Sequence, residues 1–495
     1  MIKKVLVANR GEIAVRIIRA LNEMDIKSVA IYSDIDKNAV HTQLADEAIR
    51  VGPPPALESY LNQDAIINAA LQTGCDAIHP GYGFLSERYD FNQKVHNAGL
   101  IFIGANPQSM RLLGSKVQSR QIMSKAGIPI IPGMMASTKD YKEFEDYAEK
   151  IGFPILIKAS DGGGGKGMRI VSTMKDLQSA IDTAMRESMS AFGSDAIYLE
   201  KYLENPRHIE FQIARDHFGN VIHLNERECS IQRRHQKIIE ETPSPIMTPE
   251  LRKQMGDAAI KVVNSADYDN IGTVEFLVDK DLNFYFLEVN ARVQVEHPIT
   301  EMTTGIDLVK LQINIADNQP IPYKQDDIQQ NGHAIECRIY AEDADNNFTP
   351  SPGKILYIKE PVGPGIRYDS GIEVGTEVPT FYDPILSKLI AWGKTRDEAI
   401  KRMTTALKQN VILGVKTSIN FMINVINHPE FKAGNTNTNF LDDYFSEKIQ
   451  TSKEDLNLAI GATSFSGNHT YDIKNINQFS KMNNPWLEIG KWELF

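Results

Sequence analysis

Short apolar runs alternate with helical patterns from the start of the chain to about residue 110. KKVLVA, SVAIYS, DAIHP and LIFIGA have strand-like composition, and GEIAVRIIRALNEM places Ile13, Ile17, Leu21 and Met24 on one helical stripe. This alternation is typical of a parallel sheet, because parallel strands need long helical crossovers. We therefore predict a Rossmann-like N-terminal α/β domain. Its first turn, ANRGEIA, lacks the G-x-G-x-x-G fingerprint, which disfavours NAD binding.

The pattern changes in the rest of the chain. From Lys116 to Gln319 the predicted strands are paired and antiparallel in character, and after Gly332 strands (HAIECRIYA, KILYIKE, PILSKLIAW) mix with helices. One of these helices should begin at Thr395, because Glu398 lies at the capping-box spacing. The polar end of the chain is predicted to be a loosely held extension. The predicted fold class is thus mixed α/β.

Composition narrows the class of protein. The formal net charge of -11 argues against the broad basic surface that nucleic-acid binding requires. No run approaches the roughly 18 apolar residues of a membrane span, and the start turns polar at Asn9, unlike a secretory signal. Cys75, Cys229 and Cys337 show no paired spacing, which favours a reducing compartment over disulfides or zinc. We expect a soluble cytoplasmic enzyme.

A glycine-rich segment separates two predicted strands. In PILIKASDGGGGKGMRI, Gly162–Gly165 lie between Lys158 and Lys166. Glycines allow successive amides to converge on an anion, and the lysines add positive charge. The order differs from a Walker P-loop and is closer to the glycine flap over phosphates in kinases. We predict phosphate binding over a flexible linker or hairpin tip, although Asp161 counts mildly against it.

A predicted hairpin brings two acids together. If GTVEFLVDKDLNFYFLEVN turns between Asp281 and Leu282, Glu275 lies directly opposite Glu288. Like charges so placed are destabilising, and the apolar neighbours suggest a half-buried pair. Asn290 offers a third oxygen on the same face, and such a set fits Mg²⁺ bound together with nucleotide phosphates. The alternative is a solvated acidic edge.

Polar residues continue at every second position beyond this hairpin. In EVNARVQVEHP they are Arg292, Gln294 and Glu296, as expected for one face of a strand. A guanidinium can bind a small planar oxyanion through two bonds, and a nearby carboxylate can act as a base. We therefore predict a small anionic acceptor beside ATP and Mg²⁺. The alternative is the ion-paired, exposed face of an edge strand.

Two further polar segments carry weaker signals. A solvated charged loop is the better interpretation of any single residue in the first segment, and each residue of the second could equally lie on the surface. The segments are SIQRRHQKIIEE, with Gln232, Arg233, Arg234, His235 and Lys237, and YLEKYLENPRHIE, with Glu200, Lys201 and His208.

Seven motifs together resemble one family. They are NRGEIAVRI, HPGYGFLSE, KASDGGGGKGMR, YLENPRHIE, ECSIQRRHQKIIEE, EVNARVQVEHPITE and GHAIECRIYAED, in order between Met1 and Ile449. The chain is similar to biotin carboxylase, an ATP-grasp enzyme. The resemblance implies an N-terminal pre-ATP-grasp domain, an ATP-grasp domain with a mobile glycine-rich lid, and a C-terminal biotin carboxylase domain. The implied ranges are 1–115, 116–330 (lid near 131–203) and 331–449, followed by an extension, 450–495.

The resemblance also implies a reaction. An ATP-dependent C–N ligase of this family uses ATP and Mg²⁺ or Mn²⁺ to carboxylate biotin with bicarbonate, through carboxyphosphate. This is the first half-reaction of acetyl-CoA or acyl-CoA carboxylase, used in fatty acid biosynthesis. The chain lacks a Met-Lys-Met turn, so biotin is expected on a separate chain. The implied partners are the biotin carboxyl carrier protein, the carboxyltransferase subunits and, in a homodimer, a second copy.

Residue roles are carried over from the same resemblance. Glu296 would deprotonate bicarbonate, and Arg338 would steady the enolate form of biotin. The implied catalytic residues are Arg292, Glu296, Arg338 and Lys237; Lys237, Arg292, Gln294, the Val295 amide and Arg338 would bind bicarbonate or biotin; and Glu275, Glu288 and Asn290 would bind the metal. The nucleotide would contact Lys116, Lys158, Gly164, Gly165, Glu200, Lys201, Tyr202, Leu203, His208, Gln232, His235, Glu275 and Glu288.

Some alternatives stay open at the level of sequence. Asp161 stands where some family members have glycine, and Lys166 where some have arginine; both lie in the implied lid, so these differences bear on the kinetics of nucleotide closure and not on activity. The alternatives are another ATP-grasp ligase, such as a carbamoyl-phosphate or purine-pathway enzyme, the biotin carboxylase part of a pyruvate carboxylase, or a nucleotide-binding regulatory module. The end of the chain, with Trp486 and Trp492, is predicted to dock the carrier or transferase, or else to fold back.

Overall fold

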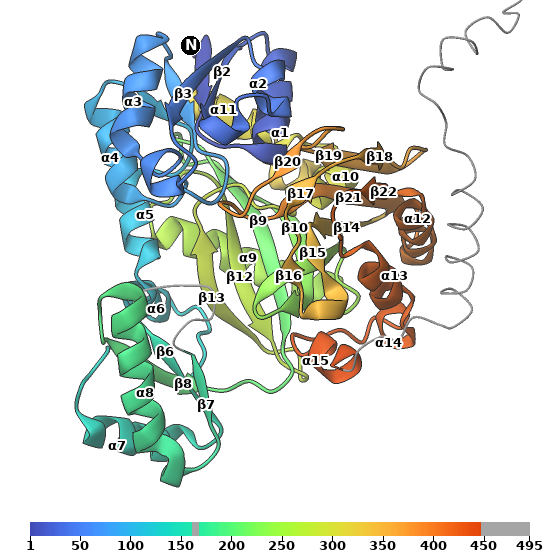
Figure 1. Cartoon of the computed structure of the whole chain (residues 1–495). Coiled ribbons are helices and arrows are strands. Elements are labelled where there is room, and N and C mark those ends of the chain that lie inside the picture. Colours follow the sequence, from blue (N-terminus) through green and yellow to red (C-terminus); the bar gives the residue numbers. More distant parts are fainter. Residues whose placement is uncertain (161–167, 447–495) are drawn as a thin grey trace, which may run out of the picture. The chain divides into compact units, whose positions relative to one another are not determined.

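The computed structural model of the chain describes residues 1–160 and 168–446 (Figure 1). The predictions for Asp161, Gly164, Gly165, Lys166 and the 450–495 extension lie outside the described residues. Packing divides the chain into Met1–Tyr444 and Phe445–Phe495, and the fold below is that of the first unit. Within the described residues, no helix is both long enough and apolar enough to cross a membrane.

The N-terminal region is a parallel five-stranded sheet of order β3-β2-β1-β4-β5, which confirms the predicted Rossmann-like domain. Alternate residues of β1 face opposite sides, so that Leu6 packs against α3 and α4 while Val5 and Val7 pack against α1. Both faces are therefore covered. The strands are β1 (Lys4–Val7), β2 (Lys27–Ser33), β3 (Glu47–Gly52), β4 (Ala77–His79) and β5 (Ile101–Phe102). The helices are α1 (Gly11–Glu23), α2 (Val40–Leu44), α3 (Gln63–Gln72) and α4 (Tyr89–Asn97).

A separate three-stranded antiparallel sheet, of order β7-β6-β8, carries two helices on one face (Figure 1). Ile155 and Ile157 of β6 pack against those helices, whereas Leu156 and Lys158 face the other side. The elements are β6 (Ile155–Ala159), β7 (Arg169–Val171), β8 (Ile197–Lys201), α7 (Tyr141–Ile151) and α8 (Met174–Phe192). Helices α5 (Pro107–Gly114) and α6 (Lys116–Lys125) connect this body to the N-terminal sheet.

The largest sheet has eight antiparallel strands in the order β13-β12-β9-β10-β11-β14-β21-β19. It runs across the predicted boundary at residues 330 and 331, because β11 pairs with β14. The strands are β9 (Arg207–Arg215), β10 (Val221–Arg233), β11 (Gln236–Thr242), β12 (Asn270–Val278), β13 (Phe284–Asn290), β14 (His333–Tyr340), β19 (Ile366–Ser370) and β21 (Ile385–Gly393). The predicted domain boundaries stay a prediction.

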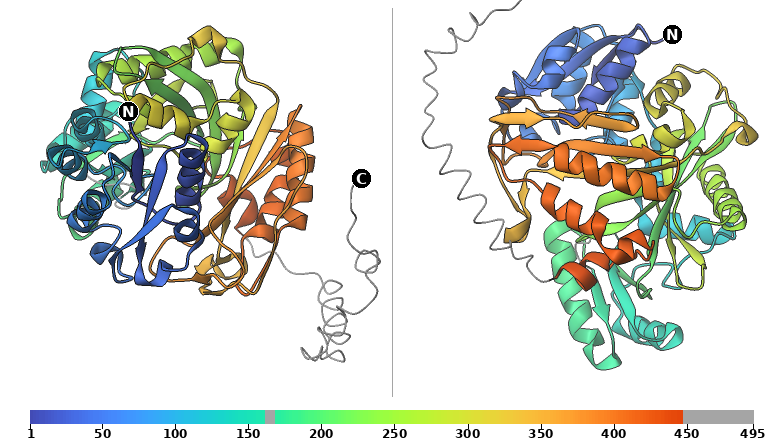
Figure 2. Two further views of the ribbon diagram at one scale, coloured as in Figure 1. Left: turned by 90° about the horizontal axis from the view of Figure 1, so that it is seen from above. Right: turned by 90° about the vertical axis from the view of Figure 1, so that its right-hand side faces the viewer.

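Helices cover this sheet, and short strand pairs border its C-terminal part (Figure 2). Helix α12 packs on β14 and β21. The helices are α9 (Pro249–Ser265), α10 (His297–Thr304), α11 (Leu308–Ala316), α12 (Arg396–Gln409), α13 (Ile419–Asn427), α14 (Pro429–Lys432) and α15 (Phe440–Phe445). The short strands are β15 (Glu342–Asp343), β16 (Thr349–Pro350), β17 (Gly353–Lys354), β18 (Tyr357–Lys359), β20 (Glu377–Val378) and β22 (Val411–Leu413).

The predicted register of the acidic hairpin is correct at the pair of acids. Glu275 pairs with Glu288, but a bulge follows, so that Phe276 pairs with Phe286. The turn therefore centres on Asp281, and the predicted centre between Asp281 and Leu282 is wrong by half a residue. A bulge inserts one extra residue into one strand, and sequence alternation does not reveal it.

Three strand and helix predictions need correction in detail. β13 ends at Asn290, so residues 291–296 are not the strand that their alternation predicted. KILYIKE forms two short strands, β17 and β18, instead of one. Thr395 caps α12 by accepting the Glu398 amide at 3.3 Å, but the Glu398 carboxylate accepts the Lys394 amide, so the box is not reciprocal.

Candidate active site

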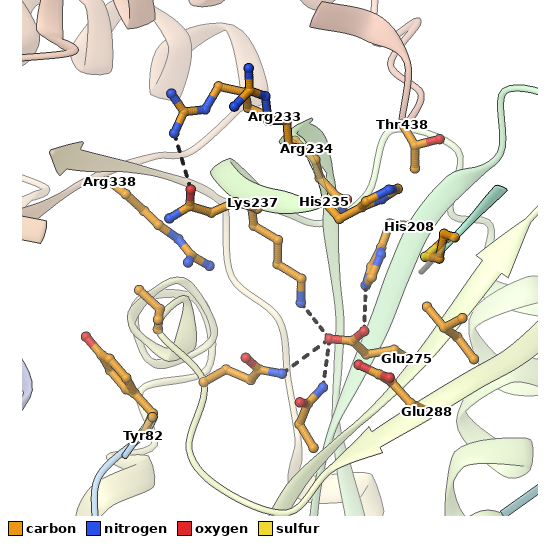
Figure 3. Close-up of a pocket in the computed structure, with 18 of the residues that line it drawn as sticks. Tyr82, His208, Arg233, Arg234, His235, Lys237, Glu275, Glu288, Arg338 and Thr438 are labelled. Atoms are coloured by element: carbon orange, nitrogen blue, oxygen red, sulfur yellow. Dashed lines mark hydrogen bonds and ion pairs between the residues drawn. The ribbon is translucent and has the colours of Figure 1, made fainter. Parts of the chain in front are cut away.

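A cavity of about 1120 Å³ lies where the N-terminal loops, the three-stranded sheet and the eight-stranded sheet meet (Figure 3). It gathers every predicted site residue that the structure describes except Glu296, which is buried directly behind it. The predicted residues that line it are Lys116, Lys158, Glu200, Lys201, Tyr202, Leu203, His208, Gln232, His235, Lys237, Glu275, Glu288, Asn290, Arg292, Gln294, Val295 and Arg338.

Three acids lie side by side across neighbouring strands. Glu275 of β12 pairs with Glu288 of β13 on one side and with Glu210 of β9 on the other. Next in this row is Arg227 of β10, fully buried, whose Nε lies 2.5 Å from Glu210. His208, two residues before Glu210 on the same face of β9, lies 3.1 Å from the Glu275 carboxylate.

Lys237 neutralises much of this negative charge. Its ammonium lies 2.5 Å from Glu210, 2.7 Å from Glu275 and 2.8 Å from Glu296. Burial alone would lower the pKa of Lys237, but the three carboxylates hold it well above the ordinary value. The amine is therefore a permanent cation at the centre of the site (Figure 3).

The pKa values of the two hairpin acids are shifted in opposite directions. Burial would raise the pKa of Glu275, but Lys237 and His208 lower it below the ordinary value. The pKa of Glu288 is raised, first by burial and then by the charge of Glu275. A divalent cation would relieve this repulsion, and carboxylate and amide oxygens are the ligands that Mg²⁺ prefers. The paired carboxylates therefore fit such an ion, and Asn290 lies beside them, where its side-chain N–H donates to Glu275 at 2.9 Å and its oxygen accepts from Arg292 at 3.0 Å.

The segment after β13 is held by side chains instead of by strand pairing. Arg292 donates to the side-chain oxygens of Gln294 at 2.8 Å and Asn290 at 3.0 Å, and it pairs with Glu87 at 3.1 Å. Glu87 also accepts the Ala291 amide. These bonds hold the guanidinium at the cavity wall, although residues 291–296 do not form the strand that was predicted.

Glu296 is fully buried between two cations. One carboxylate oxygen lies 2.8 Å from Lys237 and the other 2.9 Å from Arg338. Burial would raise the pKa of Glu296, but these two cations hold it well below the ordinary value. Arg338 also binds Glu240 at 2.6 Å, and burial, only partly offset by Arg338, raises the pKa of Glu240 to about 7.

The three-stranded sheet supplies the opposite wall of the cavity. Leu156 and Lys158 point from β6 away from the helices, and they line the cavity together with Glu200 of β8. Lys158 forms an ion pair with Glu200, and Arg120 lies 3.2 Å from the same carboxylate. Lys158 is buried, so this wall of the cavity carries a cation that is ion-paired with Glu200.

Local structure positions Lys201 and His235, two of the residues predicted to contact the nucleotide. The Lys201 ammonium donates to the carbonyls of Gly152 and Phe153 at 3.1 and 2.9 Å. Arg234 and His235 form the two-residue turn between β10 and β11, both with positive φ. This tight turn places His235 at the cavity edge.

Sequence reasoning missed several charged residues of the site. Glu87, Glu210 and Glu240 all lie within the quoted motifs, yet their partners are distant in sequence. The signal available for Glu210 was its spacing of two from His208, which places both on one face of a strand. No comparable signal pointed to Glu87.

Comparisons with known proteins cover most of the chain. Family models match three consecutive parts: "Biotin carboxylase, N-terminal domain" over residues 1–110, "Carbamoyl-phosphate synthase L chain, ATP binding domain" over 115–324, and "Biotin carboxylase C-terminal domain" over 336–443. A pyruvate carboxylase subunit of Methanothermobacter thermautotrophicus is 51% identical over 444 residues, 90% of each chain. The biotin carboxylase of Halalkalibacterium halodurans is 50% identical over 448 residues, 90% of this chain and 99% of that relative.

Solved structures give the same picture. The biotin carboxylase domain dimer of Hydrogenobacter thermophilus 2-oxoglutarate carboxylase, in complex with MgADP, ADP and bicarbonate, has a TM-score of 0.87 and 45% identity. The comparison covers 91% of this chain and all of that one. The biotin carboxylase–β,γ-ATP complex from Campylobacter jejuni also has a TM-score of 0.87, with 44% identity over 90% of this chain and 99% of that one.

Proposed function

This chain belongs to the biotin carboxylase family, and we propose that it uses ATP and Mg²⁺ to carboxylate carrier-borne biotin with bicarbonate. The family resemblance predicted from the motifs is confirmed, as is the mixed α/β fold with an ATP-grasp region. The observation that carries the proposed reaction is the position of Glu296. A carboxylate held between Lys237 and Arg338, beside a second guanidinium, suits proton transfer next to a bound anion.

The metal would be held by Glu275, Glu288 and Asn290. When bound, it would offset the negative charge of the nucleotide phosphates and of the paired acids. The protein's own contribution is the hairpin register, which holds the two carboxylates opposite each other. Mn²⁺ would fit the same oxygen ligands.

Bicarbonate would be bound by Arg292, Gln294, the Val295 amide and Lys237. Arg292 is oriented for this by its bonds to Gln294 and to Glu87. When Lys237 also contacts the substrate anion, it would stabilise the Glu296 carboxylate less. The pKa of Glu296 would then rise, which makes it a better proton acceptor. Glu296 then accepts the bicarbonate proton, and the resulting oxygen attacks the γ-phosphorus of ATP to give carboxyphosphate and ADP.

Arg338 would act in the second step. Carboxyphosphate breaks down to CO₂ and phosphate, the phosphate takes the ureido N–H proton of biotin, and the nitrogen attacks CO₂. The negative charge that develops on the ureido oxygen needs a fixed cation, and Arg338 is held by Glu240 and Glu296 at the cavity wall. The chain is in this proposal an ATP-dependent C–N ligase.

The nucleotide would lie against the three-stranded sheet and the β10–β11 turn. Lys116, Lys158 and His208 supply cationic or hydrogen-bonding side chains there. The remaining proposed contacts are Glu200, Lys201, Tyr202, Leu203, Gln232 and His235. The predicted amides of Gly164 and Gly165 lie outside the described residues.

The proposed partners are a biotin carboxyl carrier protein, carboxyltransferase subunits and a second copy of the chain. The homodimer is supported by the domain dimer of the Hydrogenobacter relative. The acceptor of the full complex is an acetyl-CoA or acyl-CoA in the first candidate function and pyruvate in the second, which the 51% identity to a pyruvate carboxylase subunit favours. The cytoplasmic location stays a prediction of the sequence.

The test is ATP hydrolysis by the purified chain with and without bicarbonate and biotin. The proposal requires that hydrolysis depend on bicarbonate and increase with biotin, and that carboxybiotin form. Hydrolysis that ignores both compounds would favour another ATP-grasp ligase, and ATP binding without turnover would favour a regulatory module. Glu296→Gln, which keeps the side-chain shape, should remove turnover while ATP binding persists.

A further inference from the structure

A tight turn of the proposed bicarbonate site is held from behind by two buried side chains. His297 and Lys388 are both fully buried, and neither lines the cavity. His297 Nδ1 lies 2.7 Å from the carbonyl oxygen of Gln294. Lys388 Nζ lies 2.9 Å from the carbonyl oxygen of Val295. Two successive carbonyls of the turn are thus bound on the interior side.

The hydrogen bond from His297 to the Gln294 carbonyl determines the direction of the Val295 amide N–H. The carbonyl of Gln294 and the N–H of Val295 belong to one trans peptide group, in which they point in opposite directions. Because His297 draws the carbonyl into the interior, the Val295 N–H points the other way. Val295 lines the cavity, so its amide is directed at the anion that we propose binds there.

The protonation of His297 follows from its surroundings. A ring nitrogen 2.7 Å from a carbonyl oxygen must carry a hydrogen, so Nδ1 is the donor. Nε2 is buried without a hydrogen-bond partner among the described residues, 3.9 Å from Glu301. Burial, followed by the charges of Lys388 and Arg16, holds the pKa of His297 well below its ordinary value. The ring is a neutral, singly protonated donor.

Lys388 fixes the other half of the turn. Its ammonium lies 3.3 Å from Glu12, which also binds the Tyr82 hydroxyl at the cavity wall. On β21 it is directly opposite Arg338 of β14. The turn is therefore attached to the same pair of strands that carries the arginine of the proposed second step.

We propose that His297 is a positioning residue that aims the Val295 amide at bicarbonate by donating Nδ1–H to the Gln294 carbonyl. The inference rests on the proposed function, because it concerns the affinity of that site for bicarbonate. Without the ring donor, the Gln294 carbonyl keeps only the backbone amide of His297, at 3.3 Å, so the peptide group is held less firmly and the directed hydrogen bond to the anion weakens. A hydrogen bond to a charged group corresponds to roughly a tenfold change in affinity.

The test compares two substitutions that preserve opposite properties of the histidine. His297→Phe keeps a ring that fills the site but has no donor. His297→Asn leaves unfilled volume but places an amide N–H close to the position of Nδ1. The Michaelis constants for bicarbonate and for ATP are measured by bicarbonate-dependent ATP hydrolysis, and the melting temperature by calorimetry.

If His297 positions the amide, the Phe variant should be the worse of the two in bicarbonate binding and the Asn variant the worse in melting temperature. His297→Phe should raise the Michaelis constant for bicarbonate about tenfold with little change for ATP, and His297→Asn should restore it, although Asn melts lower. His41→Phe is the matched control, since His41 is another fully buried histidine that holds a carbonyl, that of Ile31, outside the site. It should lower the melting temperature without altering the bicarbonate constant.

Two other outcomes would overturn the inference, and a third would overturn the proposed function. A wild-type bicarbonate constant in His297→Phe overturns the inference, and so does an equal rise in the Phe and Asn variants, because packing and not the donor would then matter. If the wild-type chain hydrolyses ATP without regard to bicarbonate, the proposed function itself fails, which is a different result.

Discussion

Glu275 and Glu288 face each other across β12 and β13, yet in the described part of the chain only Glu275 is paired with a cation. Among the described residues Glu288 forms no ion pair, and burial and the charge of Glu275 raise its pKa. The free protein therefore keeps one carboxylate neutralised by Lys237 and leaves the other to be neutralised by an added cation. This inequality makes Glu288 the more informative position to mutate.

Glu288→Gln should abolish turnover, with a loss of at least about 100-fold in kcat, because it removes a metal-binding charge without changing shape. The same change removes a repulsion, so the melting temperature without metal should not fall. Asp281→Asn, at the exposed tip of the same hairpin, is the control and should leave kcat unchanged. Near-normal activity of Glu288→Gln at ordinary Mg²⁺ would rule out the hairpin as the metal site.

Substitutions of Arg292 and Arg338 should have different effects on ATP hydrolysis and on biotin carboxylation. Arg292→Ala should raise the Michaelis constant for bicarbonate about tenfold or more, because it also releases Gln294 and Asn290. Arg338→Ala should impair biotin carboxylation more than the bicarbonate-dependent ATP hydrolysis seen without biotin. Arg88→Ala is the control, since Arg88 is exposed and paired with Asp90.

Arg338→Ala should also change the pH profile. Lys237 and Arg338 together hold the pKa of Glu296 low, so the loss of one cation raises it. The acid limb of bicarbonate-dependent ATP hydrolysis should then move to higher pH. Equal losses in both activity assays, with an unshifted limb, would contradict the role assigned to Arg338.

His41 should make the fold sensitive to mild acid. Burial lowers its pKa from 6.5 to about 4, so the unfolded chain binds a proton that the folded chain excludes. Stability is therefore complete above pH 6.5 and falls as pH decreases toward 4, by up to about 3 kcal/mol. Denaturant unfolding at pH 7 and pH 4.5 should show a smaller difference for His41→Gln than for the wild type. An identical difference would mean that His41 is not the group responsible.

The carrier is expected on another chain, and residues 450–495 are expected to help bind it. The purified chain should contain no covalent biotin by avidin blotting. Deletion of Gln450–Phe495 should leave carboxylation of free biotin intact and abolish co-purification with the carrier or transferase subunits. Undiminished co-purification after deletion would exclude the docking role.

The acidic hairpin of the site follows from the sequence pattern because its pairing is local. The pairing of Glu275 with Glu288 depends on a hairpin only a few residues long, and alternation predicts it. The bulge that follows changes the register without changing the alternation, so no sequence pattern revealed it. The same alternation was misleading beyond Asn290, where side-chain bonds from Arg292 replace strand pairing.

Contacts between distant segments could not be predicted in this way. Lys237 was assigned to bicarbonate through the resemblance, but its three carboxylate partners come from β9, β12 and the residue before α10. Glu240 and Glu87 were missed for the same reason. Charged residues inside predicted strands are informative only once the strand order is known, and the order β12-β9-β10-β11-β14 is not sequential.

The pairing of β11 with β14 has a consequence for how such a chain can be divided or exchanged. Family models end and begin on either side of this junction, at residues 324 and 336, as if two modules met there. A fragment ending near residue 330 would expose the open edge of β11, and its complement the edge of β14, both prone to aggregate. A recombinant in which the C-terminal segment is replaced must therefore preserve the β11–β14 ladder, from Ile239 opposite Cys337 to Thr242 opposite Ala334. Two segments that separate family models match are therefore joined here in one continuous sheet.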